Sequence, residues 1–152
     1  MKKATFLFSL FASLVLISNS AFSQIRKIPS NATETLKQKY PTAESVEWKD
    51  QLSHYTAKFR LEDKDYEVHF DNKGDLKESL VKLDESEIPA PVKDGLEKSK
   101  YSEWAIDKVE KLESSDGKLQ YRLQLKDGDI KKKIVYFTPE GKLAKDHITL
   151  WF

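Results

Sequence analysis

Two stretches of the chain share one pattern, YEVHFDNKGDL from Tyr66 to Leu76 and KIVYFTPEGKL from Lys133 to Leu143. In each stretch, alternating apolar residues lead into a polar turn that contains a glycine, Gly74 or Gly141, and a leucine follows. Self-similarity at a long period is typical of a duplicated structural unit. The chain is therefore expected to fold as two copies of one small unit.

Other matches keep the same order in both halves of the chain. Ile28-Pro29 and Ile88-Pro89 are 60 residues apart, and the offset has risen to 67 at the repeated pattern above. The offset grows where the second copy has the longer turn KLESSDGK, which is what a lengthened hairpin would produce. We predict two tandem units, at about 28–83 and about 88–150.

Each unit is predicted to begin with a short helix, over 32–39 in the first copy and 91–98 in the second. A proline lies near each helix entry, where its missing N–H is not needed. Ser30 and Asn31 are candidate N-terminal caps of the first helix. Gly95 lies inside the second helix, where a glycine is expected to cost about 1 kcal/mol relative to alanine.

Four strands are predicted after each helix, because apolar and polar residues alternate. In YTAKFRLE, for example, Tyr55 and Phe59 point to one side while Lys58 and Arg60 point to the other. Alternation with one polar face indicates antiparallel strands that cover a core with one side only. The inward aromatic residues are expected in that core, namely Trp48, Tyr55, Phe59, Tyr66, Phe70, Tyr121 and Phe137.

The turns and the last strands of the two units carry further signals. Gly74 and Gly141 are expected to adopt positive φ in hairpin turns. Apolar residues five positions apart, at 76 and 81 and again at 143 and 148, break the alternation and predict a β-bulge or kink in each last strand. The second unit's first strand, in EWAIDKVEKLE, fits two registers, so the sequence does not place Trp104.

The N-terminus has the pattern of a secretory signal peptide, predicted as residues 1–23. A basic start precedes an apolar run from Ala4 to Ile17, and the small residues Ala21 and Ser23 precede the expected cleavage site. The run is shorter than the roughly 20 apolar residues that a membrane-spanning helix needs. We expect a periplasmic or secreted mature protein, residues 24–152, that forms a single domain and has no stable membrane insertion after cleavage.

Composition excludes several classes of function. Without Lys2 and Lys3, the mature chain has 24 basic and 25 acidic residues, a balance that favours neither nucleic acid nor an anionic membrane as partner. The chain has no cysteine, which excludes thiol catalysis, thiolate metal sites, disulfides and a cysteine-linked lipid.

Catalytic and metal-binding motifs are also missing. The three histidines, His54, His69 and His147, have no metal-motif spacing, and no G-x-S-x-G or phosphate-binding glycine loop occurs. The acidic stretches DNKGD and DGD fit turns better than calcium loops. We therefore expect a non-enzymatic protein without cofactor or metal.

The order KQKYPTAESVEW, then YTAKF, then YEVHFDNKGDL, with a degenerate second copy, resembles the PepSY-like, β-lactamase-inhibitor-like family of exported bacterial proteins. The resemblance covers about Ile28 to Leu150. It implies an α+β fold in which two tandem helix-plus-four-strand units form one curved antiparallel sheet with helices on one face. The other face of the sheet would be open, and the inhibitor after which the family is named holds its target with that face.

The open face is the predicted contact surface for an unidentified protein or peptide partner in the cell envelope. Aromatic and arginine side chains are frequent anchors of binding surfaces. Tyr136 has the opposite parity to its core neighbours and aligns with His69 of the first copy. The candidate binding residues are Lys58, Arg60, His69, Arg122 and Tyr136.

Two alternatives remain open at this point. One is a ligand-binding or hydrolytic protein with a pocket between the sheet and the helices, which would need converging polar groups. The other is self-association through the edge strands, to which Trp151 and Phe152 could contribute. We expect a monomer.

Overall fold

A computed structural model describes residues 27–148 of the 152-residue chain, and the side chains of residues 27–145. The predicted signal peptide, residues 1–23, lies outside the described residues. The same holds for Trp151 and Phe152 and for the side chain of His147.

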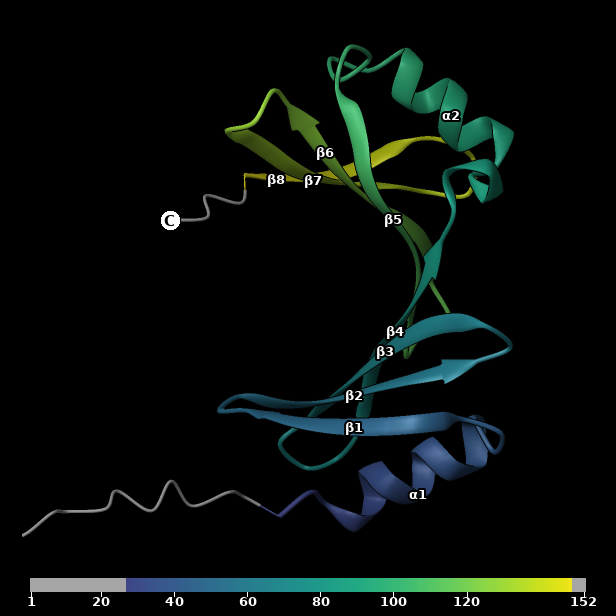
Figure 1. The fold of residues 1–152 in the computed structure, drawn as a ribbon, viewed down its shortest axis with the longest axis vertical. Coiled ribbons are helices and arrows are strands. Elements are labelled where there is room, and N and C mark those ends of the chain that lie inside the picture. Colours follow the sequence, from purple (N-terminus) through teal and green to yellow (C-terminus); the bar gives the residue numbers. More distant parts are fainter. Residues whose placement is uncertain (1–26, 149–152) are drawn as a thin grey trace, which may run out of the picture.

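The described chain forms two α-helices, one short 3₁₀-helix and eight strands in a single sheet (Figure 1). Every strand pairs antiparallel with its neighbour in sequence, so that the sheet has the order β1 to β8. This is the predicted α+β architecture of two tandem helix-plus-four-strand units. The first unit comprises α1 (Ser30–Lys39), β1 (Glu44–Gln51), β2 (His54–Leu61), β3 (Lys64–Asp71) and β4 (Leu76–Leu83). After η1 (Glu85–Glu87), the second comprises α2 (Ala90–Glu97), β5 (Ala105–Ser114), β6 (Leu119–Asp127), β7 (Lys131–Phe137) and β8 (Leu143–Ile148).

The start of α1 differs from its prediction. Pro29 is the N-cap residue, and neither Ser30 nor Asn31 makes a side-chain capping bond. Asn31 instead donates from Nδ2 to the Gly74 carbonyl oxygen at 3.2 Å and to Asp75 Oδ1 at 2.9 Å. Its amide therefore ties the helix to the β3–β4 turn, a tertiary role that the local cap pattern does not reveal.

The predicted turns and bulges are confirmed in both units. Gly74 and Gly141 adopt φ values of 87° and 80°. The register between β3 and β4 shifts so that Lys77 is the extra residue, and the register between β7 and β8 shifts at the equivalent Ala144. The same irregularity thus lies near the start of each last strand.

Each unit has its own apolar core between its helix and the sheet. The first includes Leu36, Phe59 and Phe70, and Trp48 packs beside it. The second includes Val92, Leu96, Tyr101, Tyr121 and Phe137. Trp104 packs edge-on against Tyr101, with ring centroids 5.6 Å apart, which decides its placement.

The sheet bends so strongly that the whole molecule has the shape of an arch (Figure 1). Both helices lie on its convex side, and the concave side is open. Cross-strand pairing places the polar set of residues on the concave face, as predicted. Four members of this face are nevertheless buried, namely Thr56, Leu80, Glu110 and Leu112. Leu80 opposes the buried Leu112 where β4 of the first unit meets β5 of the second.

No helix among residues 27–148 combines the length and the apolar character required to cross a membrane.

Candidate functional site

The structure places all five predicted binding residues on the concave face. Lys58 and Arg60 lie on β2 and His69 lies on β3, while Arg122 and Tyr136 are direct cross-strand neighbours on β6 and β7. Period-two alternation puts them there, because their sequence neighbours fill the two cores on the other side of the sheet.

In the first unit, His69 bridges two carboxylates. Its Nε2 lies 2.9 Å from Glu67 Oε1 and its Nδ1 lies 2.9 Å from Glu78 Oε1. The second oxygen of Glu67 pairs with Lys58 Nζ at 2.9 Å. Positive and negative groups therefore alternate from β2 to β4.

The two carboxylates fix the charge of His69. Partial burial by itself lowers the pKa of this imidazole, but the hydrogen bonds to Glu67 and Glu78 outweigh burial and raise the pKa to about 9. The hydrogen bond from His69 lowers the pKa of Glu67 to about 2, and it also lowers the pKa of Glu78. At neutral pH, His69 is an imidazolium with both nitrogens engaged, so it can act neither as a general base nor as a metal ligand.

The alternation continues into the second unit. The charge of Arg122 contributes to the lowered pKa of Glu78, so the two groups are electrostatically coupled across the junction of the units. Arg122 Nε lies 3.3 Å from Glu110 Oε2, and Lys108 Nζ lies 2.5 Å from the other oxygen of Glu110. Glu110 is only 5% exposed, so both cations serve to neutralise a buried carboxylate.

We call this set of seven alternating charges the charge ribbon: Lys58, Glu67, His69, Glu78, Arg122, Glu110 and Lys108. It crosses the sheet from β2 to β6. Tyr136 lies beside it, directly across from Arg122 in the sheet. Burial raises the pKa of the Tyr136 hydroxyl, and Arg122, Glu78 and Glu110 all act on it electrostatically. The three glutamates and Lys108 are not among the binding residues predicted from the sequence. Their strand parity is the only sequence signal that could have identified them.

Arg60 is the one predicted cation that stays outside the charge ribbon. Its guanidinium lies 3.8 Å from Asp65 and 3.6 Å from Asp63, and its side chain is 58% exposed. Arg60 and Lys58 nevertheless line the same pocket on the concave face.

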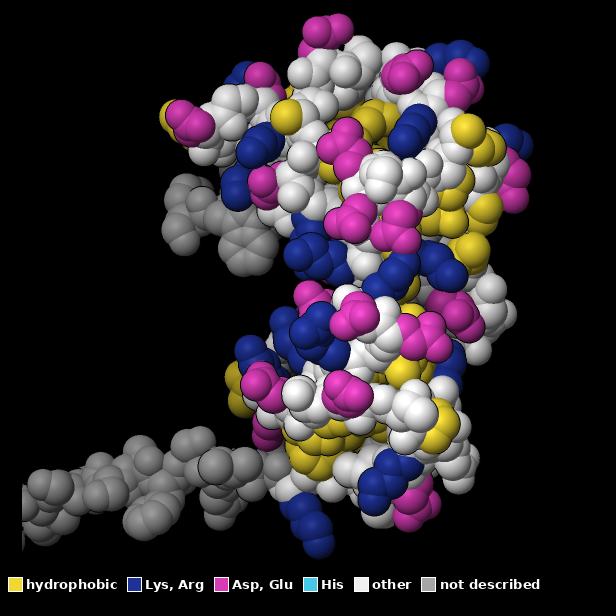
Figure 2. Space-filling model, turned by 45° about the vertical axis from the view of Figure 1, so that its right-hand side comes forward, with side chains coloured by type: hydrophobic (Ala, Val, Ile, Leu, Met, Phe, Trp, Pro, Cys, Tyr) yellow, Lys and Arg dark blue, Asp and Glu magenta, His cyan; other side chains and the backbone are white. Residues whose placement is uncertain are grey.

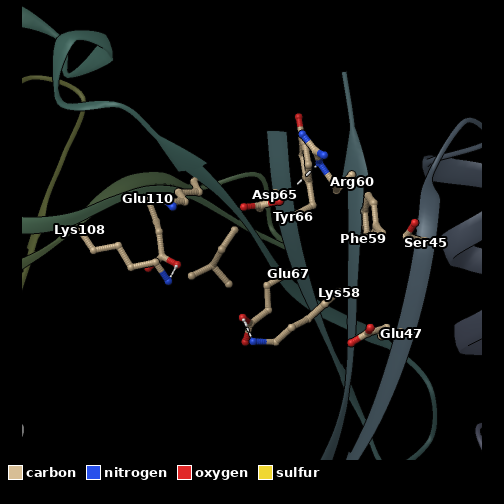
Figure 3. A pocket seen from close by; sticks show the side chains of 12 residues that line it. Ser45, Glu47, Lys58, Phe59, Arg60, Asp65, Tyr66, Glu67, Lys108 and Glu110 are labelled. Atoms are coloured by element: carbon tan, nitrogen blue, oxygen red, sulfur yellow. Dashed lines mark ion pairs between the residues drawn. The ribbon is translucent and has the colours of Figure 1, made fainter. Parts of the chain in front are cut away.

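A pocket of about 440 Å³ opens on the concave face (Figure 3). Lys58, Arg60 and Glu67 line one side, Lys108 and Glu110 reach it from the second unit, and Leu80 contributes apolar surface. Its walls therefore carry charges of both signs, and its apolar lining includes the buried side chains of Leu80 and Phe59.

A smaller pocket of about 180 Å³ lies beside the end of α1, lined by Tyr40, Val81 and Lys111 among others. This is the described cavity that comes nearest to the alternative prediction of a pocket between sheet and helices. Among the described residues, no group of three or more His, Cys, Asp or Glu side chains could hold a metal ion.

The chain matches the model of a known protein family. Residues 17–78 and 53–145 each match the family described as "Putative beta-lactamase-inhibitor-like, PepSY-like". The two matches fit the two tandem units. No curated protein matches this sequence.

Solved structures share the fold at low sequence identity. A BLIP-like protein from Bacteroides fragilis NCTC 9343 is 24% identical with a TM-score of 0.72, over 84% of this chain and 91% of that one. A DUF2874 family protein from Bacteroides ovatus ATCC 8483 is 24% identical with a TM-score of 0.74, over 81% and 89%. A structure from Bacteroides eggerthii DSM 20697, described as "putative periplasmic proteins", is 22% identical with a TM-score of 0.72, over 81% and 90%.

Proposed function

Because the chain belongs to the PepSY-like, β-lactamase-inhibitor-like family, we propose that it is an exported, non-enzymatic binding module whose concave face holds a protein or peptide partner in the cell envelope. The observation that carries this proposal is the charge ribbon, which spans both units on the one face that no helix covers. Periplasmic or secreted location and a monomeric state are part of the proposal.

The charge ribbon is suited to recognition because its side chains are held in place before a partner arrives. Lys58, His69 and Arg122 each contact a carboxylate that is itself fixed by a second cation or by burial. Groups held in this way lose less conformational freedom on binding than free surface side chains do. Complementary charges also give specificity and fast association.

The binding site comprises the five predicted residues Lys58, Arg60, His69, Arg122 and Tyr136. In the view of Figure 2, Lys and Arg side chains lie on both sides of the notch of the arch, with acidic side chains among them. A partner inserted there would contact both units at once.

The test is affinity capture from an envelope extract with the mature chain. The binding variant is Lys58→Ala, Arg60→Ala and Tyr136→Ala, which leaves Arg122 in place because Glu110 depends on it. The matched control is Lys37→Ala and Lys93→Ala, two exposed cations on the helices of the convex side. All three proteins are compared at equal thermal stability.

A protein captured by the wild type and the control, but lost from the binding variant, would support the concave face as the contact surface. Capture of the same proteins by all three would place the contact elsewhere and would refute the proposal. Absence of any captured protein would refute a protein partner in that extract and would favour a small ligand in the 440 Å³ pocket.

A further inference from the structure

The two halves of the concave face differ in charge. On β2 to β4, cations and carboxylates alternate across neighbouring strands: Lys58 opposes Glu67, Arg60 opposes Asp65, and His69 opposes Glu78. On β6 to β8, the described concave positions carry no carboxylate. They are Gln120, Arg122, Gln124 and Lys126 on β6, Lys132, Ile134 and Tyr136 on β7, and Lys145 on β8.

We call the surface formed by Arg122, Lys126, Lys132 and Lys145 the cationic wall. Within it, Lys126 and Lys132 are direct cross-strand neighbours, an arrangement of like charges that destabilises a sheet. Their shared counter-charge is Asp107 at 3.4 Å and 3.6 Å, longer than the roughly 2.7–2.9 Å of a close charge-assisted hydrogen bond. One loosely placed carboxylate thus serves two exposed ammonium groups.

Lys145 adds a third ammonium group next to Tyr136. Among the described residues it forms no ion pair. Lys126 and Lys132 therefore share one carboxylate and, among the described residues, Lys145 pairs with none. On the same face of the first unit, Lys58 and His69 each lie 2.9 Å from a carboxylate oxygen. The unequal treatment of the two halves indicates that the cationic wall is matched by charge from outside the chain.

We infer that the cationic wall receives an acidic peptide segment of the protein partner, so that this inference rests on the proposed function. Because the cationic wall is positively charged, the segment that binds it is negatively charged. The wall is not purely ionic, because the half-buried Ile134 and Tyr136 follow Lys132 on the same face of β7, and Tyr136 lies opposite Lys145 of β8. An extended peptide repeats its side chains on one face at about 7 Å, which matches the spacing of Lys132, Ile134 and Tyr136 along a strand.

A peptide suits this surface better than a nucleic acid does. The mature chain is nearly neutral, and Asp107 and Glu110 lie beside the wall, where they would repel a continuous phosphate backbone. Separate carboxylates on a peptide can meet the individual ammonium groups and avoid these acids.

The experiment measures binding of fluorescein-labelled poly-L-glutamate to the mature chain by fluorescence anisotropy at low salt. The test variant is Lys126→Gln and Lys132→Gln, and a second variant is Lys145→Gln alone. Lys37→Gln and Lys93→Gln on the helices form the control with the same loss of charge. Thermal unfolding of each variant confirms that it is folded, which is expected because all these side chains are exposed.

We expect the wild type and the control to bind with equal affinity, and the paired variant to bind about tenfold more weakly, equivalent to about 1.4 kcal/mol. Lys145→Gln should weaken binding by a smaller factor. Absence of binding to the wild type, or equal binding by the paired variant and the control, would overturn the inference. Equally tight binding of a DNA oligonucleotide would also overturn it, by showing a general polyanion surface.

Failure of this inference can be separated from failure of the proposed function by the envelope capture described above. If the paired variant keeps the captured partner while the Lys58, Arg60 and Tyr136 variant loses it, the concave face binds but the cationic wall does not contribute. If both variants keep the partner, the proposed function itself fails.

Discussion

Gly95 in α2 and Gly141 in the β7–β8 turn pack backbone against backbone. A Cβ added to Gly95 would overlap the carbonyl group of Gly141, and a Cβ added to Gly141 would overlap the carbonyl group of Pro91. The first unit has a similar contact, since a Cβ on Gly74 would lie 2.9 Å from the backbone nitrogen of Ala32. The repeated turn is therefore the point at which each hairpin meets its helix.

Replacing Gly95 by alanine tests this packing. In an ordinary helix interior the change stabilises by about 1 kcal/mol. Here we expect Gly95→Ala to lower the free energy of unfolding by about 1–3 kcal/mol, because the added methyl group forces α2 away from the turn. Urea denaturation gives the value, and a gain in stability would show that the helix and turn are not in close contact.

Gly141 and Gly117 form a matched pair for the same question. Their φ values are 80° and 79°, but a Cβ on Gly117 would have no atom within 4 Å. We expect Gly117→Ala to cost about 1–2 kcal/mol from backbone conformation alone. Gly141→Ala should cost at least about 1 kcal/mol more, because of the clash with α2. Equal urea midpoints for the two variants would contradict the packing.

His69 is expected to stabilise the first unit through its two carboxylates. His69→Gln removes the positive charge between Glu67 and Glu78, and we expect it to lower the free energy of unfolding by about 1–3 kcal/mol. His54→Gln is the control, because His54 hydrogen-bonds Ser53 and its ring lies 5.6 Å from the His69 ring, but it does not bridge the two carboxylates. It should change stability by less than about 0.5 kcal/mol. Similar losses in both variants would show that the bridge contributes no net stability.

The bridge also predicts how stability depends on pH. The pKa of His69 in the folded state is about 9, above its ordinary value of about 6.5, so its contribution is complete below pH 6.5 and is lost as the pH rises through 9. Glu67 has the opposite sign. Its pKa is about 2, so its contribution is complete above its ordinary value and is lost as the pH falls towards 2.

The stability difference between wild type and His69→Gln should therefore be largest between about pH 4.5 and pH 6.5 and shrink on both sides of this range. Urea denaturation from pH 4 to pH 10 measures this difference, and NMR titration of the His69 ring measures its pKa directly. A titration of His69 near 6.5 would mean that the bridge to the two carboxylates is not formed in solution.

Asn31 tests the link between α1 and the β3–β4 turn. Asn31→Ala removes the hydrogen bonds to Gly74 and Asp75, and we expect a loss of about 1 kcal/mol. Ser30→Ala is the control, since the Ser30 side chain forms no capping bond. If thermal unfolding shows a larger loss for Ser30→Ala, then Ser30 acts as a cap in solution and Asn31 does not act as a tie.

Much of the fold could be predicted from the sequence because it is encoded at short range. A period of two in side-chain polarity sets the strands and assigns Phe59 and Phe70 to the core. A turn with a glycine places each hairpin, and an odd spacing such as that from Leu76 to Val81 marks each bulge. These signals depend on a few consecutive residues, and the duplication repeats them in the same order.

Only the tertiary structure decided which of these residues meet. Glu78 and Arg122 are coupled because β4 and β5 join the two units in one sheet, and no local pattern relates residues so far apart. Gly95 looks unfavourable in its own helix and becomes necessary only where a turn from the end of the chain packs against it. Leu80 has the parity of an exposed residue, yet the bend of the sheet buries it. Local alternation determines on which face of the sheet a side chain lies. Register and curvature determine which side chains become its neighbours, because both arise from packing between distant segments.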